Sequence, residues 1–234
     1  MCKLINGKFV LIAIVLSIVK PASCLGADIS IYTSNLGDYV NMKYISALEG
    51  SHSPLLAQRA HLAPQVISIK RRDDTLIVSE VINWHEGCII GVTILNKQNE
   101  FTYGDCDDSK SIEMLDKNNI SLNGEKYVYV GESVNFLGWT LLGGACVDEH
   151  GLSYQFDANG AATFPGRSVH YELCLDQIVP PCSDADIFYD KDKEKAYAFK
   201  IHEDTLSLYD VPDSEMEYVD FTKPIAILHK KYFQ

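Results

Sequence analysis

Residues 169–175, VHYELCL, indicate the fold class. Apolar side chains occupy every second position of this stretch, and polar or small ones lie between them. The apolar set is Val169, Tyr171, Leu173 and Leu175. Because successive side chains of a strand point to opposite faces of a sheet, this period predicts a strand with one buried and one solvated face. Residues 197–201, YAFKI, repeat the pattern.

Similar strand patterns continue along the chain, separated by short turns. Segments rich in Val and Ile come first, followed by shorter candidates joined by turns with Asn, Asp and Gly. The candidates before residue 131 are 65–72, 75–84, 88–95, 99–105, 111–115, 119–123 and 126–130. Such a succession predicts a mainly β protein, with an antiparallel meander that closes into a barrel or forms two packed β units.

The number of candidate strands bears on how the chain divides into domains. About fifteen candidate strands are too many for one barrel of eight or ten strands. We therefore favour an N-terminal β unit over residues 28–130 and a C-terminal barrel over 131–234, with a single shared domain as the alternative. A short helical segment is expected near residues 40–62, where Ser53-Pro54 provides an N-cap followed by proline at the first helical position.

The N-terminus has the layout of a secretory signal peptide. Lys3 and Lys8 precede an apolar run of eleven residues, 9–19, and small residues follow it. This run is too short to span a bilayer, so residues 1–24 are excluded from the fold. Residues 21–24, PASC, resemble a lipoprotein signal, which would make Cys24 the lipidated mature N-terminus. Ordinary cleavage near Cys24 or Ala27 is the favoured alternative.

The charge of the chain argues against nucleic acid as a partner. Residues 1–24 hold three lysines and no acid, so their removal changes the formal net charge from −12 to −15. A chain this acidic repels phosphates and anionic membrane surfaces. We expect an exported protein of the periplasm or cell envelope, which contacts a membrane only through a lipid on Cys24 if it carries one.

Spaced aromatic residues and glycines after residue 136 support a family resemblance. The pattern includes Gly138-Trp139, Tyr154-x-Phe156-x-x-x-Gly160, a strand with Tyr171, and residues 196–211 and 226–231. It resembles the small lipocalin-like barrels of secreted bacterial proteins, although Gly138-Trp139 lacks the intervening residue of the lipocalin Gly-x-Trp signature. Residues 37–57 and 82–88 are similar to secreted bacterial proteins that often carry such a C-terminal half.

The resemblance implies a binding or structural barrel and supplies no catalytic residues. It implies that Trp139 plugs the barrel floor. Interior side chains would line an apolar pocket or simply fill the core. The candidates for ligand contact are Trp139, Tyr154, Phe156, Tyr171, Tyr197 and Phe199.

The cysteines predict disulfides. In an exported chain, cysteine pairs favour disulfides over metal or thiol chemistry. Cys174 and Cys182 flank Pro180-Pro181 between two strand candidates, and Cys88 and Cys106 bracket a hairpin in the same way. Cys146 would be unpaired, or would replace a partner in the Cys174–Cys182 pair.

Known catalytic and metal motifs are incomplete. Residues 83–88, NWHEGC, lack the second histidine of the His-Glu-x-x-His zinc motif. Residues 105–116 resemble a calcium loop, but Lys110 replaces the glycine at its sixth position and Asp116 replaces the glutamate at its twelfth. There is no Gly-x-Ser-x-Gly elbow and no phosphate-binding loop. We expect neither a metal nor a cofactor.

Three functions remain open. The favoured one is a non-enzymatic β protein that binds a small hydrophobic ligand or an envelope protein. The second is an envelope hydrolase, whose acid and histidine groups would converge in one cleft. Its candidate groups are His85, Glu86, Asp148, Glu149 and His150. The third is an accessory protein that acts through its surface, with a barrel filled by its own side chains.

Overall fold

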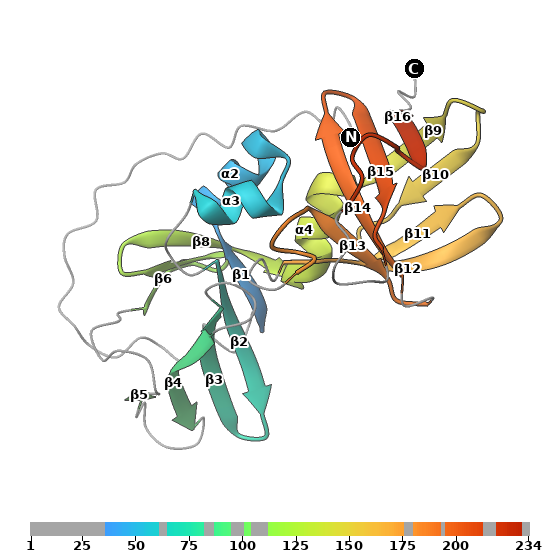
Figure 1. Ribbon diagram of the computed structural model, residues 1–234. Helices are drawn as coiled ribbons and strands as arrows, with labels where there is room; N and C mark the ends of the chain where they lie inside the picture. Colours follow the sequence, from blue (N-terminus) through green and yellow to red (C-terminus); the bar gives the residue numbers. More distant parts are fainter. Residues whose placement is uncertain are drawn as a thin grey trace.

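A computed structural model of the chain describes eight stretches of it (Figure 1). They are residues 36–60, 65–81, 87–94, 101–103, 112–175, 180–192, 195–212 and 219–230. The expected mainly β architecture is confirmed, because the described residues form one curled antiparallel sheet, one closed antiparallel barrel and three short helices. The signal-like segment, His85-Glu86 and Cys106 lie outside these stretches.

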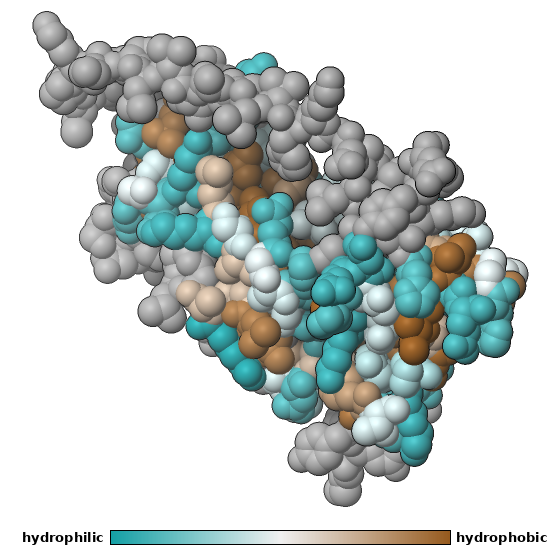
Figure 2. Space-filling model, turned by 90° about the horizontal axis from the view of Figure 1, so that it is seen from above, coloured by the Kyte–Doolittle hydropathy of each residue, from teal (hydrophilic) through white to brown (hydrophobic). Residues whose placement is uncertain are grey.

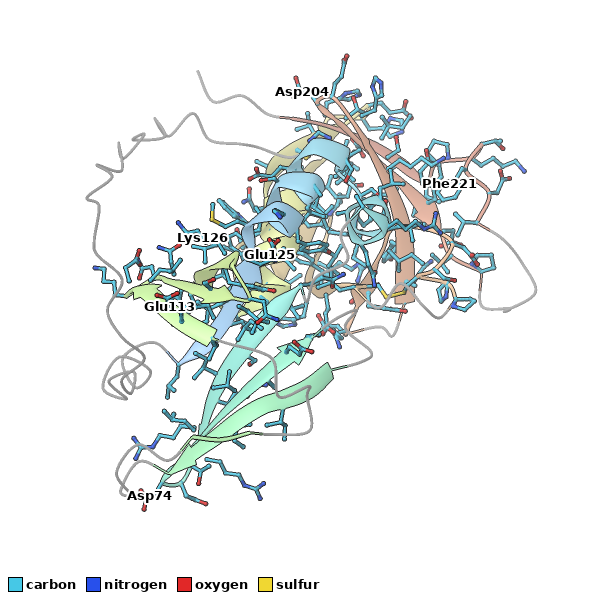
Figure 3. The ribbon with its side chains drawn as sticks, turned by 90° about the vertical axis from the view of Figure 1, so that its left-hand side faces the viewer. Asp74, Glu113, Glu125, Lys126, Asp204 and Phe221 are labelled. Atoms are coloured by element: carbon cyan, nitrogen blue, oxygen red, sulfur yellow. A yellow bond between two sulfur atoms is a disulfide. The ribbon has the colours of Figure 1, made fainter. Side chains whose placement is uncertain are left out.

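The first sheet has eight strands in the order β5-β4-β3-β2-β1-β8-β7-β6. They are β1 (Gly37–Asn41), β2 (Val66–Arg72), β3 (Thr75–Val81), β4 (Gly87–Ile94), β5 (Phe101–Tyr103), β6 (Ile112–Asp116), β7 (Asn119–Leu122) and β8 (Glu125–Gly131). The β2–β3 hairpin extends away from the barrel, with Asp74 at its tip (Figure 3). The sequence places two acids at that turn, and Asp73 there has a positive φ of 53°.

The barrel is built by the second half of the chain. Its strands are β9 (Gly144–Asp148), β10 (Ser153–Phe156), β11 (Ala161–Phe164), β12 (Arg167–Leu173), β13 (Ile187–Asp190), β14 (Lys195–His202), β15 (Thr205–Asp210) and β16 (Ala226–Lys230). Each strand pairs with the next, and β16 pairs with β9, so that the barrel is closed. The stretch VHYELCL supplies most of β12, and its apolar positions Val169, Tyr171 and Leu173 are buried, as its alternation predicts.

Two helices follow β1 and confirm the expected helical segment. Helix α2 (Met42–Ser51) is capped by Asn41, whose side chain accepts hydrogen bonds from the amides of Lys43 and Tyr44. Helix α3 (Pro54–Arg59) begins after Ser53, whose hydroxyl accepts a hydrogen bond from the Leu56 amide at 3.1 Å. Both caps satisfy amides that have no partner within the helix.

A third helix, α4 (Ser133–Leu142), which was not expected from the sequence, lies between the sheet and the barrel. Leu137, Leu141 and Leu142 are buried in a single apolar core together with barrel residues and with Tyr44 and Leu48 of α2. Figure 1 shows α4 between the first sheet and strands β12 and β13. Full burial of each leucine stabilises the fold by about 1.5–3 kcal/mol. The two β units therefore share one core.

The opposite face of the first sheet has an apolar core of its own. It contains Tyr39, Ile67, Ile69, Leu76, Val78, Ile120, Leu122 and Tyr127. Residues of β2 and β3 pack with residues of β7 and β8 in this cluster because the sheet curls. One face of the sheet is covered by helices, and the other packs on itself. Because both faces are buried at β1 and β2, these strands alternate only weakly between apolar and polar residues.

Candidate functional site

The barrel interior is packed with aromatic side chains from its own strands. Phe156, Phe188 and Phe199 have at most 1% of their surface exposed. Phe188 stacks on Tyr197 with 5.3 Å between ring centroids, and Phe156 lies edge-on to Tyr171 at 5.4 Å. These spacings lie within the range of 4.5–7 Å that is typical of interacting aromatic pairs. The interior is therefore a packed core along this part of its length.

One end of the barrel is covered by a polar cluster. The Arg167 guanidinium donates hydrogen bonds to the fully buried Asp190 carboxylate and, at 3.0 Å, to the Tyr197 hydroxyl. The hydrogen bond to Asp190 raises the pKa of Arg167. The guanidinium also lies 5.2 Å from the centroid of the Phe164 ring. Arg167 is thus held across the aromatic core at this end.

The other end is covered by α4. Gly138 approaches the Tyr171 ring so closely that an added Cβ would lie 3.1 Å from it. The Tyr171 hydroxyl donates a hydrogen bond to the Asp157 carbonyl at 3.0 Å, and burial raises its pKa. Trp139 does not occupy the barrel floor as the resemblance implied. Its side chain is 41% exposed and packs over Gly143 on the outer side of α4.

The structure therefore separates the six candidate ligand-contact residues. Tyr154, Phe156, Tyr171, Tyr197 and Phe199 belong to the apolar core of the barrel or pack against it. Trp139 lies outside that core.

The acid and histidine groups of the hydrolase hypothesis are placed in a turn. Asp148 ends β9, and its Oδ1 accepts hydrogen bonds from the amides of His150 and Leu152, both at 2.9 Å. This is the local bonding by which aspartate stabilises turns. Glu149 and His150 are both exposed, with 3.5 Å between carboxylate and imidazole. His85 and Glu86 lie outside the described residues. Within the described residues, the five candidate groups are therefore not brought together in one cleft.

The disulfide between Cys174 and Cys182 is confirmed, with an S–S distance of 2.02 Å. It closes a loop over the outer face of the barrel, where both cysteines pack with Ile187 and Tyr209. Cys146 is fully buried and is also disulfide-bonded. The expectation that it is unpaired, or paired with a cysteine of this loop, is therefore wrong. The predicted Cys88–Cys106 pair includes a cysteine outside the described residues.

The residues after this disulfide bind the N-terminal unit. The Asp186 carboxylate accepts a hydrogen bond from the Leu55 amide at 3.0 Å, and the Arg59 guanidinium donates to the Ser183 carbonyl at 3.4 Å. Burial raises the pKa of Asp186, although the hydrogen bonds from Ser53 and Leu55 act in the opposite direction. Helix α3 is thereby fixed to the barrel.

A polar pocket of about 230 Å³ lies where the start of α4 meets the barrel. Its walls come from the first turn of α4, the β10–β11 turn, strand β12 and the β13–β14 turn. The lining residues are Glu132, Val134, Asn135, Asn159, Gly160, His170, Tyr171, Glu172 and Lys191. We call this the seam pocket.

The polar groups of the seam pocket are held by neighbours. The Lys191 ammonium lies 2.5 Å from the Glu172 carboxylate. The Asn135 amide donates to Glu132 at 2.7 Å, and its oxygen lies so close to Gly160 that an added Cβ there would be 2.6 Å from it. Gly160 also has a φ of +78°, which favours glycine.

His170 is oriented from outside the seam pocket. Its Nδ1 lies 3.0 Å from an oxygen of Asp192, and its backbone amide donates to the same carboxylate at 2.9 Å. These two bonds lower the pKa of Asp192. With Nδ1 engaged, Nε2 remains the ring atom that can meet a ligand. In the sequence, His170 is one of the polar positions of the strand pattern 169–175, and that pattern gives no sign of a site.

Comparisons with known proteins identify no relatives: no family model, curated protein or solved structure matches the chain. Across the described stretches, no three His, Cys, Asp or Glu side chains lie close enough together to hold a metal ion. None of the described helices has the length and apolar character needed to cross a membrane.

Proposed function

We propose that this chain is an exported, non-enzymatic β protein that recognises a component of the cell envelope at its surface. The observation that carries this proposal is the packing of the barrel. Aromatic side chains fill its interior, Arg167 lies across one end and α4 lies across the other. A barrel that binds an apolar molecule needs free interior volume, and small barrels without it are filled by side chains.

The surface offers a better place for recognition than the interior. Figure 2 shows hydrophilic side chains over much of the described face, with hydrophobic patches between them. The seam pocket gathers charged and amide groups where the start of α4 meets the barrel, and α4 is held there by a core that it shares with the sheet and the barrel. Ligand sites commonly lie at such junctions because two walls can be positioned rigidly there.

The sequence supports the export part of the proposal. The basic start, the short apolar run and the small residues before Ala27 have the form of a signal peptide. The Cys174–Cys182 disulfide fits an oxidising compartment outside the cytoplasm. Release by ordinary cleavage and retention through a lipid on Cys24 are distinguished by the mass of the mature N-terminal peptide.

Site-specific photocrosslinking in the producing cells tests this function. A photoreactive phenylalanine analogue replaces Asn159 at the rim of the seam pocket. In a matched control it replaces Leu152, which is 47% exposed and lies just before β10, whereas Asn159 follows that strand. We expect a defined crosslinked envelope species from position 159 and none from position 152. Equal crosslinking at both positions, or none at either, would contradict recognition at the seam pocket.

A further inference from the structure

The seam pocket combines hydrogen-bond donors and acceptors without a strong excess of either charge. Its ionised side chains are two carboxylates, Glu132 and Glu172, and one ammonium, Lys191. His170 adds a positive charge when protonated, and Asn135 and Asn159 contribute neutral amides. A strongly anionic ligand would meet the carboxylates, and a strongly cationic one would meet the lysine. This composition favours a ligand that is neutral and polar.

Glu172 and Lys191 further narrow the class of ligand that fits the seam pocket. Their carboxylate oxygen and ammonium nitrogen are 2.5 Å apart, so an obligate acceptor and an obligate donor lie side by side. Two neighbouring hydroxyl groups match this pair, because each hydroxyl can donate a hydrogen bond to the carboxylate or accept one from the ammonium. Both side chains are about half exposed, and the imidazole of His170 is exposed nearby.

The size and the apolar content of the pocket agree with such a ligand. At about 230 Å³ it is smaller than the sites of drug-sized apolar ligands, which hold roughly 300–1,000 Å³. Val134 is the one aliphatic side chain in its lining, and it can contact the C–H groups of a ring. The Asn135–Gly160 contact keeps this wall close to the β10–β11 turn.

From these features we propose that the seam pocket binds a neutral saccharide unit of an envelope glycan. This inference rests on the proposed function and names its ligand class. Hydroxyls at adjacent ring carbons bridge Glu172 and Lys191, while His170 and Asn159 bind further hydroxyl or carbonyl groups. Because the polar groups of the pocket are solvated in the free protein, affinity for a single sugar is weak, and multiple units in a polymer provide avidity.

Ligand-observed NMR and calorimetric titration of the purified mature protein test the ligand class. The probes are glucose, N-acetylglucosamine and their β-1,4-linked disaccharides, together with glucosamine and glucuronic acid as charged counterparts. We expect saturable binding of at least one neutral saccharide and weaker binding of every charged counterpart. Glu172→Gln and Lys191→Met should each weaken that binding at least about tenfold, because each removes a charge-assisted hydrogen bond.

Glu149→Gln is the matched control, since Glu149 is an exposed glutamate in the β9–β10 turn and does not line the seam pocket. It should leave saccharide binding unchanged, and the midpoint of thermal unfolding verifies that all three variants are folded. Tighter binding of a charged probe, no binding of any neutral saccharide, or full affinity in both pocket variants would overturn the inference. If saccharides fail while crosslinking from position 159 persists, the ligand class is wrong and the proposed function stands. If neither saccharide binding nor crosslinking from position 159 is observed, both the ligand class and the proposed function are wrong.

Discussion

Replacing Phe188 by alanine should destabilise the protein by about 3–5 kcal/mol, the usual cost of removing a buried phenylalanine ring. Phe188 is fully buried and lies within 6.3 Å of four other rings, measured between centroids. They belong to Phe156, Tyr171, Tyr197 and Phe199. The lost transfer free energy accounts for about 1.5–3 kcal/mol, and the cavity and the missing ring contacts account for the rest.

Urea unfolding followed by circular dichroism measures this change. For a protein of this size, the same destabilisation lowers the thermal midpoint by about 6–20 °C. Phe221→Ala is the control, because Phe221 lies on the outside of the barrel, half-buried against Tyr209 and Lys200 (Figure 3). We expect the control to lose about 1–2 kcal/mol, since its ring stays partly solvated.

A second measurement separates a filled barrel from one with a ligand cavity. If Phe188 fills the core, then the alanine variant contains a new apolar cavity, which small aromatic molecules such as benzene should enter and stabilise. Benzene should then raise the thermal midpoint of Phe188→Ala and leave that of the native protein unchanged. A loss no greater than that of Phe221→Ala, or equal stabilisation of both proteins by benzene, would refute the reasoning that the interior is packed.

Three further predictions follow from local contacts. Burial raises the pKa of Asp186 above 3.8, so its contribution to stability is lost as the pH rises through its folded-state pKa; Asp186→Asn should therefore gain stability relative to the native protein from acidic to neutral pH in denaturant titrations. Replacing both Cys174 and Cys182 by serine should cost about 2.5 kcal/mol in urea unfolding, given a closed loop with a sequence separation of 8. Gly160→Ala should lower the thermal midpoint more than Gly166→Ala, although both glycines have φ near +78°, because only at Gly160 would the added Cβ lie 2.6 Å from a side-chain oxygen.

The strands were predictable because their signal is local. The alternation in residues 169–175 follows directly from a barrel wall with one face toward the core, and β12 confirms it. The cap at Ser53 likewise depends on residues a few positions apart. Because such features involve residues close together in the chain, a single sequence is enough to predict them.

Helix α4 could not be predicted in the same way. In its sequence, SVNFLGWTLL, six of ten residues are apolar, and burial along the helix does not follow the order of hydrophobicity. Gly138 and Ser133 are buried, whereas Trp139 is 41% exposed. A helix that contacts a barrel and also packs near α2 loses the single apolar stripe on which periodicity depends. The contacts that define it are set by tertiary packing.

The seam pocket was missed for a related reason. Glu132, Asn159, Glu172 and Lys191 are far apart in the sequence, and each one alone resembles an ordinary exposed residue of a turn or strand. No short motif joins them. The disulfide bond of Cys146 was also missed, because no feature of the sequence around Cys146 indicates which cysteine it pairs with.

The seam pocket depends on both β units because α4, which supplies one wall, is positioned from both sides. The Asp38 carboxylate of β1 accepts hydrogen bonds from the Ser133 hydroxyl at 2.6 Å and from its amide at 3.1 Å, which fixes the first turn of α4. At the other side, Gly138 allows the helix to approach Tyr171 of the barrel. A displacement of the sheet would therefore move Glu132 and Asn135 away from the β10–β11 turn. The pocket can keep its shape only while sheet, helix and barrel pack as one body. The shared core therefore positions the walls of the recognition site at its edge.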